Sequence, residues 1–347
     1  MPPPISPETG GCSWTSLNQT RTGDSSVRFL PRKLKISRSD LEHRPTPLAN
    51  GFISRILASV VNRYYYGFKI IMSINKATPS PLALRAGFHV VLLRALAERL
   101  QGRDWVLKGG TNLRLYFGSI RFSEDIDLDV GKDVAGAMQR AIPATLADGD
   151  VQRRLQALGI LQASLVGGRS SKSTDTTLRY KIELVGRGGI RPPTKIDVSY
   201  RDRCEGDEHA VSPANESAVR EYLRPDDPPL LLPSYTRPAA IRQKINALAS
   251  RTHVQARDVF DLFVLGDGTL RGIDTGFLRR WLDDATLRNA RGRALEISHA
   301  EYSDTVLAYL DPAQREQLQD EDTWLERQLF VGDLIDQILA VPPETIT

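Results

Sequence analysis

The segment FSEDIDLDV, residues 122–130, constrains this chain more than any other part of its 347 residues. Successive side chains of a β-strand point to opposite faces, so the segment places three carboxylates on one face and three apolar side chains on the other. The two sets are Asp125, Asp127 and Asp129, and Ile126, Leu128 and Val130. Neighbouring like charges repel and do not stabilise a sheet. The acidic face is therefore either a solvated surface or a site for a divalent cation, which prefers carboxylate oxygens.

A second acidic strand is expected downstream. In TKIDVSY, residues 194–200, Asp197 lies between Ile196 and Val198, which would face the core. Adjacent strands lie ~5 Å apart, so this strand would deliver a lone carboxylate close to the first set. Two carboxylates on one strand and a third across from them can hold two metal ions ~3.5–4 Å apart for phosphoryl transfer. The pattern predicts a metal site formed by Asp125, Asp127 and Asp197.

A glycine pair precedes the acidic strand in LKGGTNLRLYFG, residues 107–118. Gly109 and Gly110 lack the Cβ atoms that would keep backbone and ligand apart, and Thr111 is predicted to cap the following helix. Free N–H groups at such a helix start would face a phosphate. The segment is not a Walker A loop, because no G-x-x-x-x-G-K-[ST] pattern is present. An ordinary strand-to-helix corner is the alternative.

Charged residues recur in the helical segments 241–251 and 255–266. Lys244 and Arg251 are seven residues apart, so one helix face would present both as a cationic clamp for polyphosphate. Arg257 and Asp261 are four apart and would pair on the next helix. A solvated charged face with a local ion pair is the alternative.

The chain divides by composition into three parts. Residues 1–76 form a basic, partly disordered leader rich in Pro, Ser, Thr and Gly, with 11 Lys/Arg against 4 Asp/Glu. An over-extended start, with Met72 as the initiator, is an alternative for this leader. Residues 77–225 alternate expected helices (81–101, 111–118) and strands (104–108, 125–130, 178–186, 194–202). The Pro-rich stretch 225–238 is predicted to be a linker, and 226–347 a helical domain.

Composition excludes several classes of protein. Two cysteines, Cys12 and Cys204, exclude a disulfide framework and a thiolate zinc site. The five histidines are scattered, which argues against a zinc hydrolase. No apolar run approaches ~18 residues, so no transmembrane helix and no membrane partner are expected. The formal net charge of +4 comes from the leader, since the remaining residues sum to −3. A cytoplasmic protein is predicted.

Four blocks, taken in order, resemble one known family. LKGGTNLRLYFGSIRFSEDIDLDV, KIDVSY, IRQKINALASR and QARDVFDLFVL are similar to the motifs of the AbiEii/AbiGii toxin family. These are nucleotidyltransferases of the DNA polymerase β-type minimal nucleotidyltransferase superfamily. The resemblance spans roughly residues 80–265. It implies an α+β fold in which a small mixed-sheet nucleotidyltransferase domain precedes a helical C-terminal domain.

The resemblance also implies roles for single residues. Asp125 and Asp127 match the metal-binding pair and Asp197 matches the third carboxylate, while Lys244 matches the lysine that contacts nucleotide phosphates. The other matched positions are Gly110 and Thr111 at the triphosphate, Ser123 in the S-E-D run, and Asp261 in the last motif. Gln243 stands where relatives commonly have Glu, which removes a charge beside Lys244. The predicted nucleotide-binding set is Gly109, Gly110, Thr111, Ser123, Lys244 and Arg251.

Together these patterns predict an NTP-dependent nucleotidyltransferase that uses Mg²⁺, with Mn²⁺ as an alternative. An acceptor hydroxyl would attack the α-phosphate of an NTP and release pyrophosphate. By resemblance, the acceptor is the 3′ end of a tRNA, and the protein is the toxin of a toxin–antitoxin or phage-defence pair with an AbiEi-like antitoxin. Two alternatives stay open: transfer to a protein side chain, and a catalytically silent nucleotide- or RNA-binding module.

Overall fold

The computed structural model describes residues 79–201 and 208–343, so the basic leader, Met72 and Cys204 lie outside the described residues. The described residues belong to one compact unit, Lys76–Thr347. The first part of this unit contains α2 (Pro81–Arg99), β1 (Trp105–Lys108), α3 (Gly109–Tyr116), β2 (Ile126–Gly131), η2 (Lys132–Val134), α4 (Ala135–Leu146), α5 (Gly149–Ala157), β3 (Ile160–Leu165), η3 (Val166–Gly168), β4 (Lys172–Ser173), β5 (Thr177–Gly186), η4 (Arg187–Gly189), β6 (Pro193–Arg201), β7 (His209–Pro213), α6 (Glu216–Val219), η6 (Arg220–Tyr222) and β8 (Leu231–Tyr235). The second part contains α7 (Arg237–Ser250), α8 (Ala256–Leu265), α9 (Thr275–Trp281), α10 (Asp284–Glu296), α11 (His299–Thr305), η7 (Leu307–Tyr309), α12 (Pro312–Leu318) and α13 (Glu321–Leu339).

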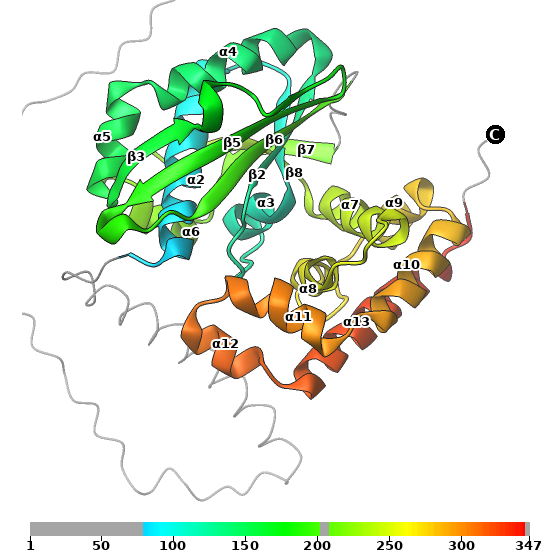
Figure 1. The fold of residues 1–347 in the computed structure, drawn as a ribbon. Coiled ribbons are helices and arrows are strands. Elements are labelled where there is room, and N and C mark those ends of the chain that lie inside the picture. The colour runs from blue at the N-terminus through cyan, green and yellow to red at the C-terminus, as the bar shows by residue number, and fades with distance from the viewer. Residues whose placement is uncertain (1–78, 202–207, 344–347) are drawn as a thin grey trace, which may run out of the picture. The chain divides into compact units, whose positions relative to one another are not determined.

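An eight-stranded mixed sheet forms the first part, in the order β3-β5-β6-β2-β1-β8-β7, with β4 paired to β5. β2 is antiparallel to β1 and parallel to β6, whereas β5 and β6 are antiparallel. The predicted α+β fold is confirmed, with the sheet followed by the helices α7 to α13 (Figure 1). The stretch predicted to be a linker contains β8, which pairs with β1 and β7, so that prediction was wrong.

One core lies between the sheet and the helices α2, α4 and α5. Alternation along β2 buries Ile126, Leu128 and Val130 completely in this core, as the sequence predicts. α2 begins where the Ser80 side chain accepts a hydrogen bond from the Ala83 N–H, followed by Pro81. Ser and Pro suit these two positions, because the first N–H groups of a helix have no partner within it.

A second core is formed by α7 to α13. Leu113 of α3 is buried in this helical core, whereas Leu115 of the same helix is buried in the sheet core. α3 therefore joins the two cores and fixes the sheet relative to α7 and α8. No helix among the described residues is both long enough and apolar enough to cross a membrane.

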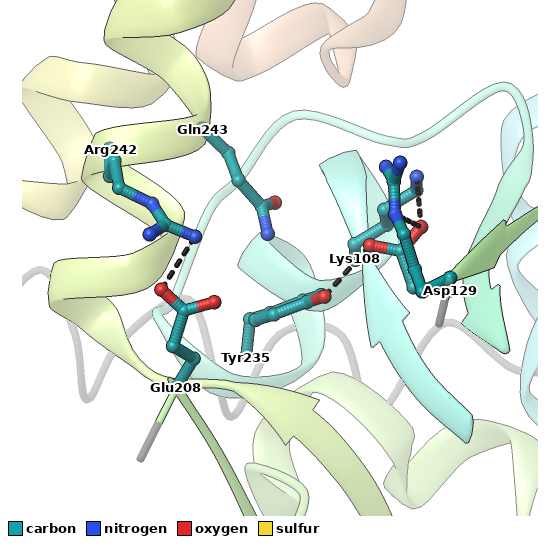
Figure 2. A pocket seen from close by; sticks show the side chains of 7 residues that line it. Lys108, Asp129, Glu208, Tyr235, Arg242 and Gln243 are labelled. Carbon is teal, nitrogen blue, oxygen red and sulfur yellow. Dashed lines mark hydrogen bonds and ion pairs between the residues drawn. The ribbon is translucent and has the colours of Figure 1, made fainter. Parts of the chain in front are cut away.

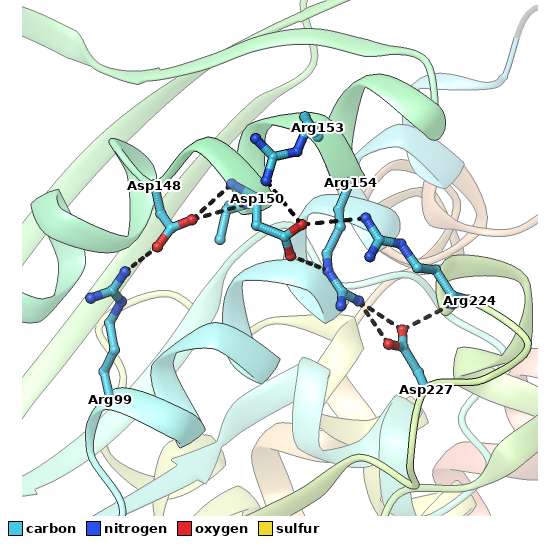
Figure 3. Close-up of polar contacts among 8 residues, drawn as sticks. Arg99, Asp148, Asp150, Arg153, Arg154, Arg224 and Asp227 are labelled. Atoms are coloured by element: carbon cyan, nitrogen blue, oxygen red, sulfur yellow. Dashed lines mark hydrogen bonds and ion pairs between the residues drawn. The ribbon is translucent and has the colours of Figure 1, made fainter.

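An ion-pair network on α5 holds the outer edge of the sheet part (Figure 3). Arg154 lies 2.7 Å from Asp150 and 2.7 Å from Asp227, and Arg224 lies 3.4 Å from Asp150. Asp148 caps α5 and pairs with Arg99 of α2. These contacts fix α5 against the turn before β8, and none of them involves a predicted site residue.

Candidate active site

The predicted acidic face is divided by the structure. Asp125 directly precedes β2, and Asp127 of β2 lies in register with Asp197 on the parallel strand β6. Asp129 is different, because it is 2% exposed, accepts a hydrogen bond from the Tyr235 hydroxyl at 2.8 Å and lies 2.6 Å from Lys108 Nζ. Asp129 is thus a paired structural carboxylate, whereas the other three aspartates lie together where the start of β2 meets the middle of β6.

Two cations that sequence reasoning missed neutralise this carboxylate group. Lys195 Nζ lies 2.8 Å from Asp125 Oδ2 and 3.7 Å from Asp197 Oδ2. Arg179 donates two hydrogen bonds to Asp197, at 2.5 and 2.9 Å. Lys195 is two residues before Asp197 and therefore lies on the same strand face, so this spacing could have predicted Lys195 as a neighbour of Asp197. Arg179 faces Asp197 only through the β5–β6 register, which the sequence does not display.

Asp127 makes no hydrogen bond or ion pair with another described residue. Burial raises the pKa of Asp127 above its ordinary value, and the like charge of Asp197 adds to the shift. Burial likewise raises the pKa of Asp125, although Lys195 acts in the opposite direction. Burial is therefore the main reason that the pKa values of both carboxyl groups lie above the ordinary value.

The chemistry of these donors fits a divalent cation. Three carboxylates on adjacent strands supply the hard oxygen ligands that Mg²⁺ prefers, and the Asp127 side chain is not paired with any residue that the structure describes. Within residues 79–201 and 208–343, however, no three His, Cys, Asp or Glu side chains are gathered closely enough to hold a metal ion. Lys195 and Arg179 occupy the oxygens of Asp125 and Asp197 instead, so these two carboxylates would have to exchange partners when a metal binds.

The glycine pair is required by close packing against the acidic strand. Gly109 has a φ of +71°, and a Cβ atom there would lie 2.3 Å from Asp127 Oδ2. A Cβ atom on Gly110 would lie 2.9 Å from Ser123 Oγ. Both positions therefore exclude larger residues, and the backbone at the start of α3 lies directly beside the Asp127 carboxylate.

Thr111 does not cap α3, so that prediction was wrong. The helix begins at Gly109 after Lys108, which makes no side-chain cap. The Thr111 hydroxyl donates to the Asp125 carbonyl at 2.8 Å, and the Ser123 hydroxyl donates to the same carbonyl at 2.9 Å. Thr111 and Ser123 thus fix the backbone that carries Asp125, and the N–H groups of the first turn of α3 are not capped by a side chain.

Lys244 is buried within an ion-pair cluster. Its Nζ lies 3.0 Å from Asp258 Oδ1 and 2.6 Å from Asp261 Oδ2, and both aspartate side chains are fully buried. Arg121 donates to both Asp261 oxygens, at 3.1 and 3.0 Å, and Arg251 lies 3.0 Å from Asp258. Lys244 and Arg251 were predicted to form a cationic clamp for polyphosphate, and in this structure both cations hold Asp258. The alternative of a solvated charged face does not describe Lys244, which is buried.

In the cluster around Lys244, the cations and the carboxylates stabilise each other's charged forms. Burial alone would lower the pKa of Lys244, but Asp261 and Asp258 raise it above its ordinary value. Burial alone would raise the pKa of Asp261, but Arg121 and Lys244 hold it below its ordinary value. The predicted Arg257–Asp261 pair is not formed, because Asp261 is held by these two cations. Arg257 is left without a hydrogen bond or ion pair among the described residues, and its charge acts on Asp127.

A polar cavity of about 320 Å³ adjoins this site along the same sheet face (Figure 2). Its walls are formed by Lys108, Asp129, Arg201, Glu208, Tyr235, Arg242 and Gln243. Gln243 points toward the cavity, and Arg242 pairs with Glu208 at 2.5 Å. The Glu-to-Gln departure noted in the sequence thus leaves a neutral side chain at a cavity that is otherwise lined mostly by charged residues.

The chain is similar to known proteins in sequence and in fold. The model of the family described as nucleotidyl transferase AbiEii toxin, type IV toxin–antitoxin (TA) system, matches residues 91–340. The fold is similar to JHP933 from Helicobacter pylori, with 20% identity, a TM-score of 0.47, and coverage of 76% of this chain and 96% of that chain. It is also similar to MenT4, a nucleotidyltransferase toxin from Mycobacterium tuberculosis, with 17% identity, a TM-score of 0.48, and coverage of 76% and 85%. No curated protein matches the sequence.

Proposed function

Because the chain belongs to the AbiEii family of nucleotidyltransferase toxins, we propose that it transfers a nucleoside monophosphate from an NTP to the 3′ end of a tRNA. The family resemblance inferred from the motifs is confirmed, and the protein is a nucleotidyltransferase of a type IV toxin–antitoxin system. The tRNA acceptor, the dependence on Mg²⁺ and an AbiEi-like antitoxin as partner are parts of the proposal, as is a cytoplasmic setting.

The carboxylates Asp125, Asp127 and Asp197 are the proposed holders of the divalent cation. When bound, Mg²⁺ would supply positive charge for the acceptor hydroxyl and for the leaving pyrophosphate. Asp127 is available for this role because its side chain has no hydrogen bond or ion pair within residues 79–201 and 208–343. Thr111 and Ser123 hold the Asp125 backbone in place, so the first carboxylate is positioned before any ligand arrives. Lys195 pairs with Asp125 and Arg179 pairs with Asp197, so both carboxylates are held in place beside Asp127.

The start of α3 is the proposed binding site of the triphosphate. Gly109 and Gly110 bring uncapped backbone N–H groups next to the carboxylates, where they can donate to phosphate oxygens. Asp258 and Asp261 hold Lys244 in a fixed position, and Arg121 in turn holds Asp261. Arg251, at the end of α7, is the more exposed cation of the set.

The unpartnered Asp127 beside the glycine turn is the observation that carries this proposal. The test incubates the full chain with each α-labelled NTP, Mg²⁺ and total tRNA, followed by separation on a denaturing gel. We expect label in the tRNA band with at least one NTP, lost in EDTA and in Asp127→Asn. Label in protein bands would favour transfer to a side chain. Binding of NTP with no labelled product at all would favour a silent binding module.

A further inference from the structure

The polar cavity beside the acidic strand has walls whose charges are already paired (Figure 2). Lys108 Nζ lies 2.6 Å from Asp129 Oδ1, and Arg201 Nε lies 3.3 Å from the same oxygen. Arg242 Nη2 lies 2.5 Å from Glu208 Oε1. Each cationic side chain on the wall thus contacts a carboxylate of the same wall. An entering phosphate would compete with these carboxylates, whereas a neutral polar ligand would leave every ion pair intact.

Gln243 presents the amide that a neutral ligand would meet. Its side chain extends from α7 toward the cavity (Figure 2), and the amide makes no hydrogen bond to another residue that the structure describes. A primary amide carries N–H donors and a carbonyl acceptor side by side. Each nucleobase also has a donor next to an acceptor on its edge, so one amide can form two hydrogen bonds with a base.

The cavity lies next to the proposed metal site along the sheet. Asp127 and Asp129 are on the same face of β2, and residues two apart on a strand are separated by about 7 Å. Lys108 is paired with Asp127 in the β1–β2 register and directly precedes Gly109, at the proposed triphosphate site. A nucleotide with its phosphates at this turn could therefore extend its ribose and base along β2 toward Asp129.

The walls of the cavity are fixed before a ligand arrives. Arg242 contacts Glu208 and also the ring of Trp281, whose centroid lies 4.9 Å from Arg242 Cζ. Tyr235 is 5% exposed, and its hydroxyl donates to Asp129 at 2.8 Å. Side chains held in this way lose little conformational freedom on binding. The volume of about 320 Å³ falls within the range of small-molecule pockets, about 300–1,000 Å³.

We propose that this cavity binds a nucleobase and that Gln243 forms hydrogen bonds to the edge of that base. The inference rests on the proposed function for the class of ligand, since a nucleotidyltransferase handles one base on the NTP and another at the 3′ end of the acceptor. Both sources present the same chemistry to Gln243. The amide can rotate to exchange its donors and its acceptor, whereas a carboxylate only accepts hydrogen bonds.

The first test measures binding by calorimetry with Mg²⁺ and the four α,β-methylene nucleoside triphosphates, which cannot release pyrophosphate. We expect Gln243→Ala to weaken the tightest of the four about three- to tenfold, because hydrogen bonds to the base are lost. Binding of inorganic tripolyphosphate, which has no base, should stay unchanged. Asn246→Ala is the matched control, since it removes an exposed amide from the same helix and should change neither probe.

The second test uses Gln243→Glu to change the preference between bases. A carboxylate accepts from the amino group of cytosine but repels the two carbonyl oxygens of uracil. The affinity for the UTP analogue should therefore fall about tenfold or more relative to that for the CTP analogue. Asn246→Asp adds the same charge to α7 at an exposed position and should leave this ratio unchanged.

The acceptor is tested with 12-nucleotide RNAs that differ only in the base at the 3′ end. A changed uracil-to-cytosine ratio for these RNAs alone assigns the cavity to the acceptor, and a changed ratio for the NTP analogues alone assigns it to the NTP. Ratios unchanged in both sets would refute the nucleobase site. None of these measurements requires transfer, so a protein that distinguishes bases through Gln243 but labels no tRNA would retain the cavity's role and lose the proposed reaction.

Discussion

Asp127 is a carboxylate that the fold holds close to the like charge of Asp197, and no described residue pairs with its side chain. We expect Asp127→Asn to lower nucleotidyl transfer by about 100-fold or more, because a metal ligand is lost. The same substitution should raise the melting temperature of the metal-free protein at neutral pH. Asp129→Asn is the matched control, and it should lower the melting temperature because Asp129 is paired with Lys108 and Tyr235.

The stabilisation by Asp127→Asn should depend on pH in a defined direction. The folded protein raises the pKa of Asp127 above the ordinary 3.8, so the charged form destabilises the folded state above that raised pKa. As the pH falls through the raised pKa and below 3.8, the wild-type side chain becomes neutral and the advantage of Asn disappears. Melting curves of both proteins from pH 7 to pH 3 measure this, and a gain that persists at pH 3 would contradict it.

Lys195 competes with a divalent cation for the same oxygens. The Mg²⁺ concentration that gives half of the maximal thermal stabilisation should fall about two- to fivefold in Lys195→Gln. The change is small because a partly exposed ion pair contributes under about 1 kcal/mol. Lys181→Gln is the control, because Lys181 faces Lys195 across the β5–β6 pair but holds no carboxylate of the described chain. An unchanged or higher Mg²⁺ requirement in Lys195→Gln would show that this ammonium does not occupy the metal position.

At the scale of elements, the ion-pair cluster joins α7, α8 and the loop that contains Arg121. Lys244→Ala removes one cation from two buried carboxylates, so we expect the free energy of unfolding to fall by about 3 kcal/mol. Arg251→Ala, at a partly exposed position, should cost under about 1 kcal/mol. Urea unfolding of both variants tests this. If the Lys244→Ala protein has wild-type stability but uses NTP less well, the prediction is contradicted. Lys244 would then contact the nucleotide without stabilising the fold.

Alternation and spacing were sufficient to predict the elements that build the site. The strands β1, β2, β5 and β6 and the helices α2, α3, α7 and α8 follow from period-2 and helical patterns that the structure keeps. β8 was not predicted, because Pro233 and the prolines before it are typical of a linker. A strand next to the sheet edge can nevertheless contain proline where no hydrogen bond between strands is lost.

The partners of the site residues could not be predicted in the same way. Sequence spacing placed Asp125, Asp127 and Asp197 on outward faces, but the contact between Arg121 and Asp261 joins residues 140 positions apart. The predicted Arg257–Asp261 pair would be favourable in an isolated helix. In the folded protein, Lys244 and Arg121 contact the Asp261 oxygens instead. Long-range packing, and not local spacing, decides which charges are neutralised.

For the whole molecule, His89 makes folding sensitive to acid. Burial, together with the charges of Arg85 and Arg114, lowers the pKa of His89 from 6.5 to about 3. The Thr194 hydroxyl donates to the Glu124 carbonyl, so it accepts from His89 Nε2 at 2.9 Å. The unfolded chain therefore binds a proton below pH 6.5 that the folded protein does not bind above about pH 3.

Stability should consequently decrease as the pH falls from 6.5 toward 3. At pH 4.5 the contribution of His89 is about 2–3 kcal/mol relative to pH 7. We expect His89→Gln, which can still donate to Thr194, to lose most of this decrease. Urea unfolding at pH 7 and pH 4.5 measures it, and His253→Gln, at an exposed histidine, is the control. Identical pH dependence in wild type and His89→Gln would show that other groups cause the acid sensitivity.

The close approach of Gly109 to Asp127 has a genetic consequence. Every amino-acid replacement at position 109 adds a Cβ atom where the carboxylate oxygen lies, 2.3 Å away, in a backbone conformation that disfavours side chains. In a selection for cells that survive expression of this toxin, codon 109 should therefore yield survivors as readily as codon 127, although glycine has no chemical group to lose. Escape mutations should therefore be equally frequent at positions 109 and 127. The frequency of survivors cannot distinguish the two positions, whereas metal binding to the purified variants can.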